Sequence, residues 1–203
     1  MDLLSYSDFE RLIDAAQKCT TCEQMCHAQK VLSWANGLPT AKIMFIAEAP
    51  GRLGADRTMI PLHGDKAGDN FEKLLSIAGF DRRSVFITNS VLCNPRDDSG
   101  NNRPPSNVEI QNCSNLLKGQ IDTVNPDFVV TLGAKALSAV ELIDSHGLTL
   151  SGGVRKSFDW YGRKLVPLYH PGTRALIHRN FASQTADYYF LAEQVKRASV
   201  RGS

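Results

Sequence analysis

Five cysteines have a spacing that suits a metal site. Cys19 and Cys22 form the pair C-T-T-C, Cys26 follows closely, and Cys93 and Cys113 lie far along the chain. A C-x-x-C pair and two distant cysteines can close a four-thiolate site for zinc or for an iron–sulfur cluster. The alternative is a set of buried, unreactive thiols. A redox dithiol of the thioredoxin type is disfavoured, because this C-x-x-C pair precedes the first predicted strand.

Three polar side chains and a glycine each come directly after a short apolar run that has the length of a buried strand. Glu48 follows the run at 43–47, Asn89 the run at 85–88, Gly133 the run at 128–132 and His170 the run at 164–169. The carboxyl ends of parallel strands meet at one rim of a sheet, where α/β proteins bind their ligands. We therefore expect a carboxylate, an amide and an imidazole to meet there. Taken singly, they also fit a carboxylate facing water, a turn-forming asparagine and a histidine bonded to the backbone.

The elements that must position these residues alternate between strands and helices. Helices are predicted at 7–18 with Ser7 as its cap, 69–79 with Asp69 as its cap, 107–124, 134–143 and 183–196. The segments 94–106 and 147–153 are predicted to be loops, and 157–166 a hairpin that leads into the last strand. This order predicts an α/β fold: a single-domain three-layer α/β/α sandwich around a mainly parallel four-stranded sheet.

Composition is that of one globular domain, which we place at residues 1–200. The chain has 203 residues, of which 42% are hydrophobic and 22% charged, and its formal net charge of +2 permits an anionic partner without requiring one. The first residues lack the apolar core of a signal peptide, and no apolar run is long enough to span a membrane. We expect a cytoplasmic monomer with no membrane association, and we interpret residues 201–203 as an expression remnant.

The motifs at these positions resemble those of the uracil-DNA glycosylase superfamily, particularly its iron–sulfur branch (family 4). The matching segments are E-A-P-G at 48–51, P-L-H-G-D-x-A-G at 61–68, N-S-V-L-C-N-P at 89–95, N-R-P-P-S at 102–106 and H-P-G at 170–172. G-A-D-R-T at 54–58 is similar to the neighbouring family 5. The resemblance extends from about Cys19 to the closing helix. It implies a DNA repair enzyme that flips uracil out of DNA and hydrolyses its N-glycosidic bond with water, leaving an abasic site.

The resemblance also implies a role for each matching residue. Glu48 corresponds to the carboxylate that positions the attacking water, and His170 to the histidine near the uracil O2. The residues around the base are Ala47, Ala49, Gly51, Leu62, His63 and Asn89, with Asn89 reading uracil. The ligands of a [4Fe-4S] cluster are Cys19, Cys22, Cys93 and Cys113. Cys26 has no ligand counterpart in the family and is interpreted as a spare thiol near the cluster, with replacement of one of the four ligands as the alternative. Uracil-containing DNA is the implied partner.

One position departs from the family pattern. Relatives have P-F where this chain has Pro61-Leu62, so the aromatic ring that stacks on the flipped base is replaced by Leu62 or by the neighbouring His63. Predicted DNA contacts are Arg96, Arg103, Ser106 and Arg174. The candidates to fill the gap left by the flipped nucleotide are Arg174, Leu176 and Ile177, and the sequence does not distinguish among them.

Two other functions remain as alternatives. One is a glycosylase-like protein that binds single-stranded or damaged DNA without cleaving it, which the presence of both Glu48 and His170 disfavours. The other is a zinc-dependent nucleobase deaminase, which is disfavoured because the chain lacks the H-x-E and P-C-x-x-C pairing of that chemistry.

Overall fold

The computed structural model describes residues 3–201, and Met1, Asp2, Gly202 and Ser203 lie outside the described part. Its centre is a sheet with the strand order β2-β1-β3-β5-β4. The strands are β1 (Ile43–Ala47), β2 (Phe86–Asn89), β3 (Phe128–Leu132), β4 (Phe158–Trp160) and β5 (Arg163–Leu168). The first three and β5 are parallel, and β4 is antiparallel to β5. The predicted mainly parallel sheet is confirmed.

The predicted number of strands was wrong, because the described residues form five strands rather than four. The additional strand is the first arm of the predicted hairpin, which pairs with the edge of β5 from Phe158 opposite Leu165 to Trp160 opposite Arg163. Tyr161 and Gly162 connect the arms with φ angles of 47° and 70°. Two successive positive φ angles match the right-handed twist of the flanking strands, so a tight turn holds the arms in register.

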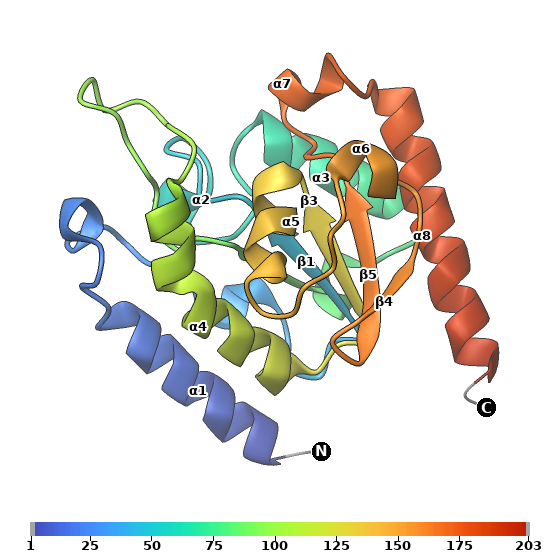
Figure 1. Ribbon diagram of the computed structural model, residues 1–203, viewed down its shortest axis with the longest axis horizontal. Coiled ribbons are helices and arrows are strands. Elements are labelled where there is room, and N and C mark those ends of the chain that lie inside the picture. The colour runs from blue at the N-terminus through green and yellow to red at the C-terminus, as the bar shows by residue number, and fades with distance from the viewer. Residues whose placement is uncertain (1–2, 202–203) are drawn as a thin grey trace.

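Helices cover both faces of the sheet, which confirms the three-layer sandwich (Figure 1). One face packs against α1 (Leu3–Gln17), α4 (Asn107–Val124) and α5 (Ala134–Glu141), and the other against α3 (Lys66–Ile77) and α8 (Phe181–Arg201). Strand β1 supplies both cores, because Met44 and Ile46 face the first helix layer while Phe45 faces the second. Burial on both faces explains why β1 is an unbroken apolar run.

The other differences from the prediction are short elements that were missed and helices and strands whose ends lie a few residues from the predicted ones. Helices α2 (Ala55–Thr58), α6 (Leu150–Gly153) and α7 (Thr173–Leu176) and the 3-10 turns Glu23–Met25, Trp34–Asn36 and Arg82–Ser84 were not predicted. Helix α1 already includes Leu3, so Ser7 is not its cap. Helix α8 starts at Phe181 and continues to Arg201.

The cap of helix α3 lies four residues before the predicted one. The side chain of Asp65, not Asp69, accepts a hydrogen bond of 2.9 Å from the backbone N–H of Gly68. Asp69 lies in the first turn, where a carboxylate is favoured by the helix dipole. Helix α4 has the predicted bounds, because Ser106 and Glu109 form a capping box at its start. In the part of the chain that the structure describes, none of the helices is long and apolar enough to cross a membrane.

Candidate active site

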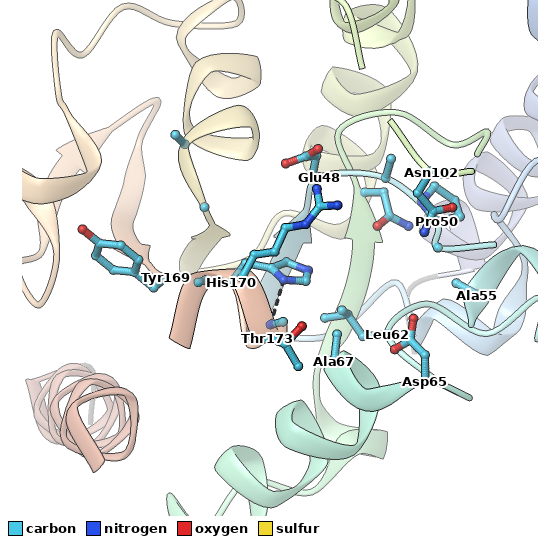
Figure 2. Close-up of a pocket in the computed structure, with 18 of the residues that line it drawn as sticks. Glu48, Pro50, Ala55, Leu62, Asp65, Ala67, Asn102, Tyr169, His170 and Thr173 are labelled. Atoms are coloured by element: carbon cyan, nitrogen blue, oxygen red, sulfur yellow. Dashed lines mark hydrogen bonds between the residues drawn. The ribbon is translucent and has the colours of Figure 1, made fainter. Parts of the chain in front are cut away.

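The ends of the parallel strands surround a cavity of about 570 Å³. Glu48 follows β1, Asn89 ends β2, Gly133 follows β3 and His170 comes shortly after β5, and all four line this cavity. Figure 2 shows Glu48 at the top of the view and His170 near its centre, with Leu62 and Asp65 below and to the right, and all four line the cavity. The predicted meeting of these side chains at one rim of the sheet is therefore confirmed.

Glu48 is a half-buried carboxylate whose backbone is held by the residue that follows β2. Its backbone carbonyl accepts a hydrogen bond of 2.5 Å from the hydroxyl of Ser90. Burial raises the pKa of Glu48, and the positive charges of Lys135 and Arg174 partly oppose this shift. The cations thus favour the ionised carboxylate, which is the form that can accept a proton from water.

The imidazole of His170 has a defined orientation and tautomer. The backbone N–H of Gly172 donates a hydrogen bond of 2.9 Å to Nδ1, so Nδ1 is the unprotonated nitrogen and Nε2 carries the hydrogen. Burial lowers the pKa of His170, and the carboxylate of Asp65 opposes this shift. The ring is therefore a neutral hydrogen-bond donor. A Cβ at position 172 would lie 2.8 Å from Nδ1, so glycine is required for this contact.

The backbone around His170 is fixed from two helices. Asn70 on α3 donates a hydrogen bond of 2.8 Å from its amide to the carbonyl of Pro171. Gln184 on α8 donates from its amide to the carbonyl of His170 at 3.3 Å. Both amide side chains are buried. These two contacts connect the histidine loop to the helix layer behind the sheet, and neither was predicted from the sequence.

Asn89 has a buried side-chain amide whose nitrogen is unpaired among the described residues. Only 2% of the residue is exposed, and its Nδ2 has no hydrogen-bond partner within the described residues. The side chain lines the cavity. An unpaired buried donor costs about 1–3 kcal/mol, which is why such groups are rare outside functional sites. A ligand that accepts this hydrogen bond would remove the cost.

The remaining predicted base-contacting residues divide into two groups. Ala49, Gly51 and Leu62 line the cavity, whereas Ala47 and His63 are absent from its lining. Ala47 is buried within β1, and His63 is exposed to solvent. Leu62 has a positive φ of 47°, an unusual conformation for this residue type. Of the two residues considered as replacements for the stacking ring, Leu62 is the one at the cavity.

The cavity also includes Asp65, which the sequence interpretation missed. One oxygen of its carboxylate caps α3, and the other lies where a Cβ on Gly54 would approach to 2.4 Å. The available signal was an aspartate three residues before Gly68, which is the spacing of a helix cap. That signal was assigned to Asp69 instead.

The predicted DNA contacts differ in whether their side chains already have partners within the protein. Arg174 lines the cavity, and no ion pair of its guanidinium is present among the described residues. Arg96 pairs with Asp56 at 2.6 Å, and Arg103 binds both carboxylate oxygens of Glu109 at 2.6 and 2.8 Å. The Ser106 hydroxyl accepts the capping hydrogen bond of α4. Beyond them, Ile177 is 83% exposed at the end of α7.

Electrostatic interactions connect the thiols of four cysteines, Cys19, Cys22, Cys93 and Cys113. Burial is the main cause that raises the pKa of Cys93 to about 12, and the charges of Cys113, Cys19 and Cys22 raise it further. Burial likewise raises the pKa of Cys113 to about 11, with contributions from Cys22 and Cys19. Cys26 has no part in these interactions. The described residues contain no group of three or more His, Cys, Asp or Glu arranged around a single metal ion.

Comparison with known proteins agrees with the geometry of the site. A profile of the uracil DNA glycosylase superfamily matches residues 35–191. The chain is 34% identical over 163 residues to a type-4 uracil-DNA glycosylase of Thermotoga maritima, covering 80% of each protein. It is 35% identical over 170 residues to a type-4 uracil-DNA glycosylase of Saccharolobus solfataricus, covering 81% of this chain and 76% of that protein.

A type-5 relative is also similar. The type-5 uracil-DNA glycosylase of Pyrobaculum aerophilum is 26% identical over 227 residues, which cover 96% of this chain and 92% of that protein. The profile match and the extent of the type-4 similarity show that the chain belongs to the uracil-DNA glycosylase superfamily, on its type-4 branch.

Proposed function

We propose that this superfamily member is a glycosylase that hydrolyses the N-glycosidic bond of uracil in DNA and leaves an abasic site. The observation that carries the proposal is the unpaired, buried amide of Asn89 in the same cavity as the neutral His170 and the carboxylate of Glu48. These groups match the three demands of the reaction, which are recognition of the base, stabilisation of the leaving anion and activation of water.

Asn89 is suited to read uracil. Its Nδ2 can donate to O4, which would satisfy the unpaired donor, while its Oδ1 can accept from N3–H. Cytosine has an amino donor in place of O4 and an acceptor at N3, so it reverses both polarities. The apolar side chain of Leu62 on the cavity wall contributes contact with the base without an aromatic stack.

His170 and Glu48 act on opposite charges that develop as the bond breaks. The Nε2–H of His170 donates to the uracil O2 as negative charge builds on the base, and one preorganised donor of this kind is worth about 3 kcal/mol. The Glu48 carboxylate orients water toward C1′ of the sugar, accepts its proton and offsets the positive charge on the sugar.

Entry of the base requires that its nucleotide leave the helix, at a cost of about a few kcal/mol. Ile177 is the residue that we assign to the gap left behind, because it is 83% exposed whereas Leu176 is half-buried. Arg174, exposed beside the cavity, is assigned to the DNA backbone. Arg96, Arg103 and Ser106 stay predicted DNA contacts, although their polar groups already have partners.

The four interacting cysteines have the chemistry that an iron–sulfur cluster needs. Cys93 and Cys113 lie within electrostatic reach of each other and of Cys19 and Cys22, and four thiolates are the ligand set that such a cluster requires. Cys19 and Cys22 would hold it from the turn after α1, Cys93 from the loop after β2 and Cys113 from α4. Such a cluster would supply a covalent link between distant segments, and the hydrolysis itself does not require it.

The test is single-turnover excision of uracil from a labelled oligonucleotide. Glu48→Gln keeps the shape and removes the charge, and His170→Ala removes the donor, so each should slow excision by about 100-fold or more with DNA binding retained. Glu10→Gln, an exposed change on α1, is the control. Wild-type rates in both active-site variants, or binding by the wild type without excision, would refute the proposal, and the second result would favour a non-catalytic binder.

A further inference from the structure

A second cavity, of about 380 Å³, lies beside the active site, and the proposed reaction does not use it. One wall comes from the turn after α1, including Met25, His27 and Gln29, and another from the loop before α4. Figure 1 shows these two segments on the side of the molecule away from α8. Asn94 and Arg103 line both cavities, so the two adjoin. A DNA strand with one nucleotide in the larger cavity would therefore pass the second.

The two arginines that line the second cavity are already paired with carboxylates. The Arg96 guanidinium pairs with Asp56 at 2.6 Å and also donates to Asn94 Oδ1 at 2.8 Å. Arg103 is bound by both oxygens of Glu109 and donates to Gln24 at 3.2 Å. A phosphate would have to compete with two carboxylates for these cations. The cavity therefore fits a neutral ligand better than an anion.

Its remaining surface combines the apolar side chains of Met25 and Ala28 with polar side chains. Met25 is 4% exposed and contributes to the cavity lining. His27 and Gln29 are exposed, and within residues 3–201 their side chains have no hydrogen-bond partner. A flat apolar face edged by hydrogen-bonding atoms is the chemistry of a nucleobase, which proteins hold by stacking and by hydrogen bonds to its edge.

We propose that this second cavity binds the base of a nucleotide adjacent to the flipped uracil on the same strand. The inference rests on the proposed function, because it takes the larger cavity as the uracil site. Single-stranded DNA is the favoured substrate for this contact, since its neighbouring base is unpaired and free to turn toward the protein. The subsite makes uracil excision depend on the neighbouring base.

The experiment uses single-stranded oligonucleotides with one uracil and a base-free tetrahydrofuran residue on its 5′ side, on its 3′ side or on neither. If the subsite exists, one of the two neighbouring bases, on the 5′ or the 3′ side, occupies the cavity. The oligonucleotide that lacks this base should show about tenfold weaker binding and about tenfold slower single-turnover excision at limiting protein. The oligonucleotide that lacks the base on the opposite side of the uracil should behave like the intact one. Affinity is measured by fluorescence anisotropy in parallel, so the subsite is tested even without excision.

The double variant His27→Ala with Gln29→Ala should reduce this difference between the oligonucleotides toward one. Both residues are exposed, so folding should be retained, and an unchanged iron content would show that the neighbouring cysteines are unaffected. Gln111→Ala, an exposed change on α4 outside both cavities, is the matched control. Equal binding and excision of all three oligonucleotides by the wild type would overturn the subsite but not the glycosylase. A uniform loss in the double variant, with the difference retained, would also overturn it.

Discussion

Replacement of Asn89 by Asp tests the base-reading role most directly. The change keeps the size of the side chain and removes the amide donor, which has no hydrogen-bond partner among residues 3–201. Uracil O4 would then face an acceptor in a site where the residue is only 2% exposed. An unpaired buried group costs about 1–3 kcal/mol, which corresponds to a slowing of uracil excision by about 5- to 150-fold.

The pH dependence of this variant follows from the burial of the new carboxyl. Burial raises the pKa of an aspartate, so Asp at position 89 would be protonated at a higher pH than usual and could then donate to O4. The ratio of variant to wild-type uracil excision should therefore rise as the pH falls. At higher pH the carboxylate can accept from the cytosine amino group, and slow excision of cytosine is expected.

The assay is single-turnover excision from single-stranded oligonucleotides that carry uracil or cytosine, measured for the variant and the wild type across a pH series. Asn115→Asp, an exposed change on α4, is the control for the added charge. A ratio near one at every pH, with no change in base preference, would show that Asn89 does not read the base.

Three further predictions concern the cysteines, the carboxylate and the histidine loop. Cys93→Ala should lose iron and lower the unfolding midpoint, because Cys93 is proposed to bind a cluster that joins distant segments, whereas Cys26→Ala should keep the iron content and the midpoint of the wild type. Loss of iron in Cys26→Ala and its retention in Cys93→Ala would contradict the ligand assignment. Lys135→Ala removes a charge that lowers the pKa of Glu48, so the fall of excision in acid should begin at higher pH, and an unchanged pH–rate profile would contradict this. Asn70→Ala leaves the Pro171 carbonyl without its donor and should lower kcat by about tenfold with little change in KM, whereas equal effects on both would indicate a different role.

Local patterns predicted most of the elements correctly. The run at 43–47 is buried on both faces, and the residues that follow it cannot continue a strand, so its end was clear from neighbouring residues alone. Helix α4 was likewise predicted with its observed bounds, and the capping box that Ser106 and Glu109 form in the structure shows that its start also depends on residues within one turn of chain. The short helices were missed because a single turn has no apolar periodicity to reveal it.

The order of strands and helices was also sufficient to place Glu48, Asn89 and His170 at one rim, because parallel strands bring their carboxyl ends together whatever their exact partners. It was not sufficient to count the strands, since β4 belongs to the sheet only through its pairing with β5. Likewise, the cysteine spacing left the role of Cys26 open, and it is the fold that brings Cys93 and Cys113 within electrostatic reach of Cys19 and Cys22.

The sequence by itself therefore determined which polar residues stand at the ends of the strands, because a strand and the residue that follows it are only a few positions apart. Only the tertiary structure decided which groups are free to act. Arg96 is paired with an aspartate 40 positions away, and Asn70 reaches a carbonyl 101 positions away, whereas Nδ2 of Asn89 has no hydrogen-bond partner in the described part of the chain. Burial and ion pairing depend on neighbours that are distant in the chain, and folding alone brings those neighbours into contact, whereas the hydrogen bond that fixes the tautomer of His170 comes from Gly172, two residues away.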